Sequence, residues 1–180
     1  MNRWKTIKSD TLLNNHWITV HKDAVELPDN KTIDDYYTIT LNDAVSVVAM
    51  DESGNVILVK EYRYCCGCDS IEIPAGTFEK GETDPLIVAK RELLEETGYE
   101  SEGWTYLGST SESTAKLTNR MHIFFAHHCH KISNQNLDET EDIEVLIISL
   151  EKAVEMVMQG EIICNSSAHG ILRVARMLGK

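Results

Sequence analysis

Two hydrophobic periods occur along the chain, and together they predict a mixture of strands and helices. Residues 44–50 and 56–60 are rich in Val and Ile and are separated by a polar turn at 51–55, which favours a β-hairpin. β-branched and aromatic residues mark further strands, which we place at residues 17–21, 25–27, 34–41, 70–73, 104–107, 122–128 and 143–150. Helical spacing of hydrophobic residues predicts helices at residues 83–97, 151–159 and 167–178. The pattern therefore indicates an α+β or α/β/α protein.

Length and composition are those of an ordinary globular chain. With 180 residues, of which 42% are hydrophobic and 26% charged, the chain can form one domain with a core and a small accessory part. The longest hydrophobic runs are long enough for strands and too short to span a bilayer. The first ten residues show no signal-peptide pattern. We therefore expect a cytoplasmic protein with no membrane partner.

The net charge of −12 limits the kinds of partner. It would repel the phosphate backbone of a nucleic acid, so we expect no nucleic-acid partner. A small anionic substrate is still compatible with this charge, provided that a bound divalent metal reverses the charge locally.

The five cysteines leave two interpretations open. Cys65 and Cys68 have the spacing of half a zinc site, and residues 127–130, His-His-Cys-His, could supply the other half. Alternation along a strand would point the side chains at 127–130 to both faces of a sheet, which is a poor ligand geometry. We therefore favour reduced, free cysteines over a structural zinc site, whose removal by a chelator would unfold the protein.

The helix expected at 83–97 carries a second feature besides its hydrophobic stripe. Leu86, Ala89 and Leu93 form that stripe, whereas three carboxylates share another face: Glu92, Glu95 and Glu96. Like charges at this spacing destabilise a helix by about 0.2–0.5 kcal/mol per pair, and acidic residues near a helix C-terminus face the negative end of its dipole. Either this face is simply solvated, or it binds a hard divalent cation such as Mg²⁺.

The residues around the acidic face resemble a known family. Gly76, Glu82 and residues 91–99, Arg-Glu-Leu-Leu-Glu-Glu-Thr-Gly-Tyr, resemble the Nudix box, whose second half is matched at every fixed position. One departure lies between Glu82 and Arg91, where eight residues stand in place of the family's seven. The added residue falls around 83–85, where proline suits the first turn of a helix. The acidic face of the helix is therefore left undisturbed.

The resemblance implies an α+β fold, the α/β/α sandwich of Nudix proteins, over residues 44–180. It also implies a small antiparallel N-terminal β subdomain, residues 1–43, that builds a homodimer and contributes to substrate recognition. The implied ligands of Mg²⁺, or of Mn²⁺ in its place, are the backbone carbonyl of Ala75 and the side chains of Glu92, Glu95 and Glu96. Arg91 would orient these carboxylates, and a metal-activated water would attack a phosphorus of a diphosphate.

Resemblance beyond the box points to the ADP-ribose and nucleotide-sugar pyrophosphatase branch. Residues 56–63 and 72–76 lead into the box and are similar to the corresponding segments of that branch. This similarity implies substrate binding by Arg63 and Glu72. Without that role, Arg63 is a surface arginine at a strand end. The acidic loop at 138–145 implies that Glu139 or Glu141 acts as a general base or as a metal ligand. The alternative is a flexible acidic loop without a catalytic role.

We therefore expect hydrolysis of the diphosphate bond of a nucleoside diphosphate sugar, such as ADP-ribose or another ADP-sugar, to a nucleoside monophosphate and a sugar phosphate. Residues 111–120 lack the proline that ADP-ribose enzymes of the branch often carry, so the base and the sugar are left open. One alternative is a Nudix hydrolase of another nucleoside diphosphate derivative or of a nucleoside triphosphate. The other is a nucleotide-sugar-binding module without turnover.

Overall fold

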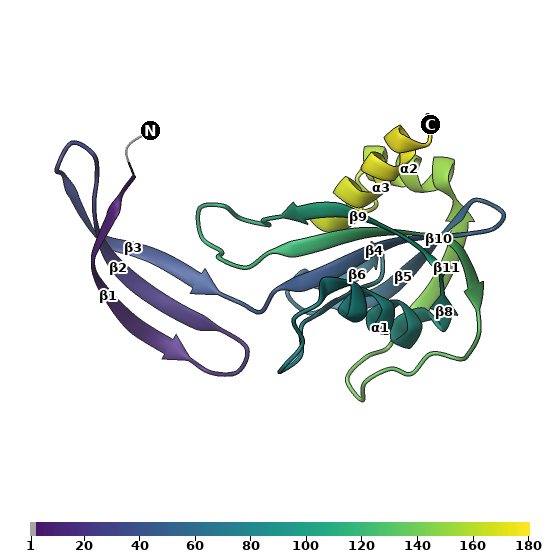
Figure 1. The fold of residues 1–180 in the computed structure, drawn as a ribbon, viewed down its shortest axis with the longest axis horizontal. Helices are drawn as coiled ribbons and strands as arrows, with labels where there is room; N and C mark the ends of the chain where they lie inside the picture. Colours follow the sequence, from purple (N-terminus) through teal and green to yellow (C-terminus); the bar gives the residue numbers. More distant parts are fainter. Residues whose placement is uncertain (1–2) are drawn as a thin grey trace. The chain divides into compact units, whose positions relative to one another are not determined.

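The computed structural model describes residues 3–180, which form two compact units (Figure 1). One unit contains the described residues up to Asp43 together with Ser111–Arg120. The other contains Ala44–Thr110 and Met121–Lys180. The first unit is therefore discontinuous in sequence, because a segment from the middle of the chain belongs to it.

The first unit is a three-stranded antiparallel sheet. Its strands, in the order β1-β2-β3, are β1 (Lys5–Asn14), β2 (Thr19–Glu26) and β3 (Thr32–Thr40). Every residue of β1 is exposed. Its sequence lacks the hydrophobic alternation that marks a half-buried strand, and it was therefore not predicted. The prediction of separate strands at 17–21 and 25–27 is wrong, because both segments contribute to β2. The Asn15 side chain accepts hydrogen bonds from the N–H groups of Trp17 and Ile18 and turns the chain just before this strand.

The segment Ser111–Arg120 joins the first unit through β3. The Ile39 N–H donates to the Lys116 carbonyl at 2.8 Å, and the Thr118 N–H donates back to the Ile39 carbonyl at 3.1 Å. The ammonium nitrogen of Lys116 also lies 4.9 Å from the centre of the Tyr36 ring, within the range of a cation–π contact. Backbone pairing and this ring contact together hold the segment on the small sheet.

The second unit is built on an eight-stranded mixed sheet. Its strands are β4 (Ala44–Asp51), β5 (Asn55–Arg63), β6 (Cys68–Glu72), β7 (Ala75–Thr77), β8 (Tyr99–Glu100), β9 (Gly103–Thr110), β10 (Met121–Lys131) and β11 (Glu144–Ser149). Its helices are α1 (Pro85–Thr97), α2 (Leu150–Gln159) and α3 (Asn165–Met177). β10 pairs with β4 in parallel, and β4 pairs with β5 as the predicted antiparallel hairpin. The remaining predicted strands and helices of this unit are present with shifted ends. β7 and β8 were not predicted, because strands this short leave no recognisable pattern in the sequence.

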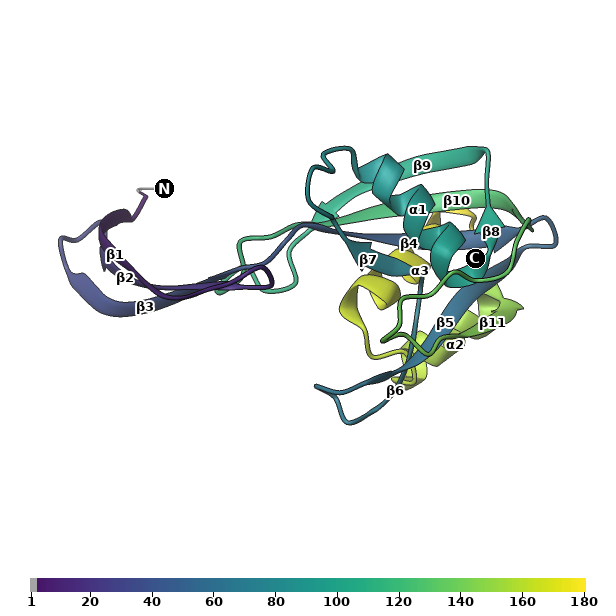
Figure 2. The ribbon, with the colours of Figure 1, turned by 90° about the horizontal axis from the view of Figure 1, so that it is seen from below.

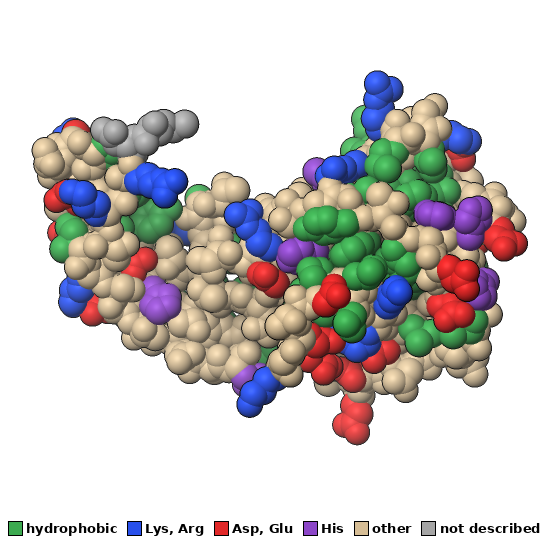
Figure 3. All heavy atoms as spheres, in the orientation of Figure 1, with side chains coloured by type: hydrophobic (Ala, Val, Ile, Leu, Met, Phe, Trp, Pro, Cys, Tyr) green, Lys and Arg blue, Asp and Glu red, His purple; other side chains and the backbone are tan. Residues whose placement is uncertain are grey.

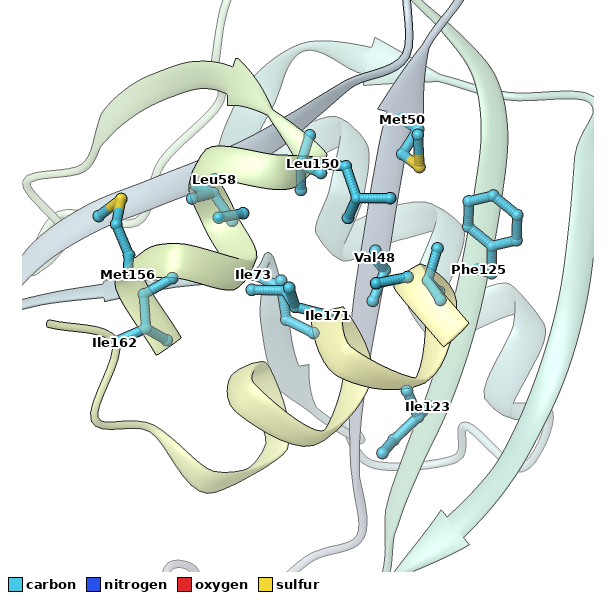
Figure 4. Close-up of a cluster of buried hydrophobic side chains, with 14 of the residues drawn as sticks. Val48, Met50, Leu58, Ile73, Ile123, Phe125, Leu150, Met156, Ile162 and Ile171 are labelled. Atoms are coloured by element: carbon cyan, nitrogen blue, oxygen red, sulfur yellow. The ribbon is translucent and has the colours of Figure 1, made fainter. Parts of the chain in front are cut away.

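Alternation along β4 divides the core into two layers. Val48 and Met50 face α2 and α3, where Ile73 and Ile171 complete the packing (Figure 4). The intervening side chains of the strand face α1 in a second cluster: Val45, Val47 and Ala49. Figure 2 shows the sheet between α1 on one side and α2 with α3 on the other. The predicted α+β class, an α/β/α sandwich with an N-terminal antiparallel sheet, is confirmed.

Both ends of α1 carry residues typical of a helix start and stop. The Asp84 side chain accepts from the Leu86 N–H at 2.9 Å, and Pro85 occupies the first turn, where its missing N–H costs nothing. Gly98 ends the helix with φ 75°, and its N–H donates to the Leu94 carbonyl. A Cβ at Gly98 would lie 2.2 Å from the carbonyl oxygen of Ser133, so glycine is needed for this approach as well as for the angle.

The cysteines and histidines of the predicted alternative zinc site do not follow a regular strand. His128 has φ 57°, and the register of β10 shifts between Ala126 and Cys129. This irregularity breaks the alternation expected for 127–130. Each of the five cysteines is a free thiol. None of the helices in residues 3–180 is long and hydrophobic enough to cross a membrane.

Candidate active site

Two carboxylates of α1 are buried against the short strand β7. Glu96 Oε2 accepts a hydrogen bond from the Ala75 N–H at 3.1 Å. The Glu92 carboxylate lies so close to Gly76 that a Cβ there would come within 2.0 Å of it, which explains why a side chain cannot stand at this position. Glu92 is 9% exposed and Glu96 is 4% exposed. The structure thus brings together Ala75, Glu92 and Glu96 from the predicted site.

Burial makes negative charge on these two groups unfavourable. It raises the pKa of Glu96 to about 9, with repulsion from Glu92 as the next contribution. Burial also raises the pKa of Glu92 to about 7, although the nearby Arg91 opposes this increase. A purely structural helix would have no reason to bury two glutamates this close to one another. An added positive charge at this place would remove the conflict.

Arg91 holds the carboxylates that surround the buried pair. Its guanidinium donates to both Glu82 oxygens at 3.1 Å and to Glu95 Oε2 at 2.9 Å, and Nη1 lies 2.9 Å from Glu92 Oε1. It also donates to the Thr77 carbonyl at 3.2 Å. Although one residue more than in the family pattern separates Glu82 from Arg91, the Glu82 side chain still contacts the helix through Arg91.

A second arginine lies at the end of β5. Arg63 donates through Nε and Nη2 to the two Glu72 oxygens at 3.0 and 2.8 Å, and Nη2 lies 2.6 Å from Glu61 Oε1. Burial alone would raise the pKa of Glu72, but the hydrogen bonds from Arg63 and Ser70 lower it. Arg63 and Glu72 are therefore placed together, as expected of two residues that share a role. The Arg63 side chain is 40% exposed and can still be reached from solvent.

Glu61 belongs to this group and was missed in the sequence analysis. Burial raises its pKa, Arg63 opposes that rise, and the charges of Glu72 and Glu141 add to it. The available signal was the two-residue spacing between Glu61 and Arg63, which puts both side chains on one face of a strand. Gln135 was also missed. Its side-chain NH₂ donates to the carbonyls of Glu96 at 2.7 Å and Ile143 at 3.0 Å, which ties the acidic loop to the end of α1.

The acidic loop contributes one of its two candidate residues to this region. The charge of Glu141 raises the pKa of Glu61, Glu92 and Glu96, so its carboxylate lies within electrostatic reach of all three. The same carboxylate accepts from the Asp138 N–H at 2.9 Å. In the described part of the chain, Glu139 is not among the main charges that raise the pKa of these three glutamates, and both loop residues are exposed. Figure 3 shows acidic side chains gathered around the start of α1 and the loop below it.

The arrangement of these side chains bears on metal binding. Across residues 3–180, no three or more His, Cys, Asp or Glu side chains are already arranged as a metal-binding group. Glu92 and Glu95 are turned to Arg91, and Glu96 is turned to the Ala75 N–H. The donor set nevertheless suits a hard divalent cation, because buried carboxylates beside a backbone segment offer only oxygen ligands.

The burial of Glu96 predicts how stability changes with pH when no divalent cation is present. Because the folded-state pKa is raised, stability is greatest below the unfolded value of about 4.5 and falls as the pH rises toward about 9. Glu96→Gln keeps an acceptor for the Ala75 N–H and removes the charge. In EDTA we expect this variant to unfold a few degrees above the wild type at pH 8 but together with it at pH 5, since ~1 kcal/mol shifts Tm by about 2–4 °C at this size.

Circular dichroism melts at the two pH values check this expectation. Glu102→Gln, at an exposed position, is the matched control and should leave Tm unchanged at both. An equal Tm for Glu96→Gln and wild type at pH 8 would show that burial does not make the charged form of Glu96 unfavourable.

Comparison with known proteins identifies the family of the chain. Residues 40–162 match the NUDIX domain, and residues 4–39 match the nucleoside diphosphate sugar hydrolase N-terminal domain. The methanol dehydrogenase activator of Bacillus methanolicus is 33% identical over 88% of this chain and 85% of its own length. The ADP-ribose pyrophosphatase of Bacillus subtilis (strain 168) is 33% identical over 93% and 90%.

A solved structure of an ADP compounds hydrolase is similar in fold. Its TM-score is 0.84 over 99% of this chain and 96% of its own, at 18% sequence identity. The family match covers more than half of the chain and includes the buried carboxylates, Glu92 and Glu96, together with Ala75. The chain therefore belongs to the NUDIX domain family.

Proposed function

We propose that this protein hydrolyses the diphosphate bond of a nucleoside diphosphate sugar to a nucleoside monophosphate and a sugar phosphate, with Mg²⁺, or Mn²⁺ in its place, as cofactor. The observation that carries the proposal is the pair of buried carboxylates, Glu92 and Glu96, packed on the backbone of Ala75 and Gly76. The match to the nucleoside diphosphate sugar hydrolase N-terminal domain supports the substrate class. ADP-ribose is our first choice because a relative of similar length is named for it.

The metal would be held by Glu92, Glu95, Glu96 and the backbone carbonyl of Ala75. When bound, a divalent cation supplies positive charge to diphosphate oxygens and lowers the pKa of a bound water. Arg91 keeps the carboxylates in place through its bonds to Glu92 and Glu95 and to the loop residue Glu82. Removing Arg91 would leave several carboxylates to repel one another without a counter-charge.

Arg63 is our candidate for binding the diphosphate. Its bonds to Glu72 and Glu61 use Nε and Nη2, so the donors of Nη1 can serve an oxygen of the substrate. Glu72 holds the planar guanidinium by two hydrogen bonds and so fixes the direction in which the remaining donors point. This arrangement favours a substrate-binding role for Arg63 over that of an isolated surface arginine.

Glu141 is our candidate for the group that accepts the proton of the attacking water. Of the two glutamates that the sequence analysis left open, Glu141 lies within electrostatic reach of Glu92 and Glu96. The hydrogen bonds of Gln135 to the end of α1 and to Ile143 hold both ends of the loop that carries Glu141. The loop is thus anchored at its start and finish.

A substrate panel tests the proposed reaction directly. With Mg²⁺ present, we expect ADP-ribose, ADP-glucose or GDP-mannose to yield a nucleoside monophosphate and a sugar phosphate, as measured by chromatography of the products. Nucleoside triphosphates should be hydrolysed far more slowly. Release of pyrophosphate from triphosphates with the sugars left intact would overturn the proposed substrate class. Binding of a nucleotide sugar without any turnover would instead favour a binding module.

Glutamine substitutions test the assigned residues. Glu96→Gln should lower kcat by orders of magnitude, because it removes a carboxylate from the metal site while keeping a similar shape. Glu141→Gln should lower kcat by about 10²–10⁴, the range for loss of a general base. Glu139→Gln, in the same loop, is the matched control and should change kcat little. A larger loss for Glu139→Gln than for Glu141→Gln would reverse the assignment within the loop.

We further propose that the first unit builds a homodimer and contributes to substrate recognition. β1 is exposed along its whole length and carries Ile7, Leu12 and Leu13 at its surface, each about half exposed. An exposed, partly hydrophobic edge strand is a surface that natural proteins usually cover. A second copy of the chain supplies such a cover.

The mass of the protein in solution tests this association. Sedimentation equilibrium should give a dimer for the wild type and a monomer for the double variant Leu12→Glu, Leu13→Glu. Met158→Glu, at an exposed hydrophobic position on α2, is the control and should remain dimeric. A monomeric wild type at micromolar concentration would contradict the proposal.

A further inference from the structure

Three of the five cysteines lie together at one end of the second unit. Cys65 and Cys66 lie in the turn between β5 and β6, and Cys68 is the first residue of β6. We call residues 64–68 the hairpin tip, and all three thiols are exposed. Cys129 is buried and Cys164 is partly buried. The catalytic proposal above uses none of the three exposed thiols, although the hairpin tip directly follows Arg63.

Hydrogen bonds make the hairpin tip and Arg63 a single turn. The N–H groups of Cys66 and Gly67 donate to the Arg63 carbonyl at 3.0 and 2.9 Å. Gly67 has φ 66°, which lets the chain reverse, and Cys68 pairs with Arg63 across the two strands. A change in the backbone of the hairpin tip is therefore transmitted to the residue that carries the guanidinium.

The other two cysteines are poor candidates for thiol chemistry. Burial raises the pKa of Cys129 to about 11, so little of its reactive thiolate form is present at neutral pH. The Cys164 sulfur lies 3.3 Å from the Ser166 hydroxyl oxygen, within hydrogen-bond distance. The exposed thiols of the hairpin tip differ from both in being open to reagents in solution.

We propose that the hairpin tip is a thiol-modification site, in which Cys65 and Cys68 form a reversible disulfide by exchange with a small-molecule disulfide. Their Cys-x-x-Cys spacing is the one used by dithiols that exchange in this way. A bond between the neighbours Cys65 and Cys66 is disfavoured, because adjacent Cα atoms are about 3.8 Å apart and disulfides usually need about 4.4–6.8 Å.

The reaction is balanced without any further reagent. The Cys65 thiolate attacks one sulfur of the small disulfide, which forms a mixed disulfide and releases one small thiolate. The Cys68 thiolate then attacks the Cys65 sulfur, closes the protein disulfide and releases the second small thiolate. The two protons of the protein thiols pass to the released thiolates. The protein loses two electrons and the small disulfide gains them.

The disulfide should weaken diphosphate binding, and this second part rests on the function proposed above for Arg63. Closing the ring draws Cys68 toward Cys65, and Cys68 is the cross-strand partner of Arg63. The bidentate contact of Arg63 with Glu72 depends on the register of the same two strands. We therefore expect oxidation to raise KM for the substrate several-fold and to change kcat less.

Peptide masses test the modification without reference to activity. Trypsin cleavage after Arg63 and Lys80 releases residues 64–80, which contain all three thiols of the hairpin tip. The intact protein is treated with oxidised glutathione, then denatured, alkylated and digested. We expect this peptide to carry one internal disulfide and one alkylated cysteine, and to become fully alkylated after dithiothreitol. Three alkylated cysteines, or glutathione adducts alone, would overturn the proposal.

Serine variants identify the pair of cysteines. Cys66→Ser, the matched control, should still form the internal disulfide, whereas Cys65→Ser and Cys68→Ser should not. A disulfide that persists in either of the last two variants would show that the assigned pair is wrong. Oxidation should raise KM in the wild type and in Cys66→Ser only. If the disulfide forms and KM is unchanged, the link to Arg63 is refuted; if no substrate is hydrolysed, the proposed function fails while the peptide masses still decide on the thiol site.

Discussion

The burial of two like-charged groups on one helix is the constraint on which the second unit depends. Glu92 and Glu96 lie against the backbone of Ala75 and Gly76, where charge is costly for both. β7 positions that backbone, because Ala75 and Gly76 pair with β4 in the centre of the sheet. A protein that only had to fold would gain stability by neutral side chains here. A cation bound at the proposed metal site would offset this cost.

Two arginines hold the acidic side chains that surround the buried pair. Arg91 contacts carboxylates from the loop and from its own helix, whereas Arg63 contacts carboxylates from two strands. In both cases the planar guanidinium, with donors in a fixed fork, satisfies several oxygens at once. A chain with net charge −12 can therefore concentrate negative groups in one region without local unfolding. The same pairing leaves the Arg63 side chain partly exposed.

Local signals in the sequence were sufficient for α1 and its acidic face. The helix follows from the spacing of Leu86, Ala89 and Leu93, and its ends follow from Pro85 and Gly98, because each of these effects acts within a few residues. β1 could not be predicted, because a strand exposed on both faces has no hydrophobic period. The hydrogen bonds of Gln135 to Glu96 and Ile143 join distant segments, which spacing along the chain does not reveal. For the same reason, sequence alone could not choose between Glu139 and Glu141.

The register of β5 and β6 connects the catalytic region with the hairpin tip. Glu61 and Arg63 lie two residues apart and share one face of β5, and Arg63 reaches Glu72 because the turn aligns Arg63 with Cys68. A shift of one residue would send every side chain of the strand to the opposite face. Arg63 and Glu61 would then move together to the other face, and the guanidinium would lose its contact with Glu72. The conformation of the four-residue turn from Tyr64 to Gly67 thus determines whether the Arg63 guanidinium lies beside the candidate active site.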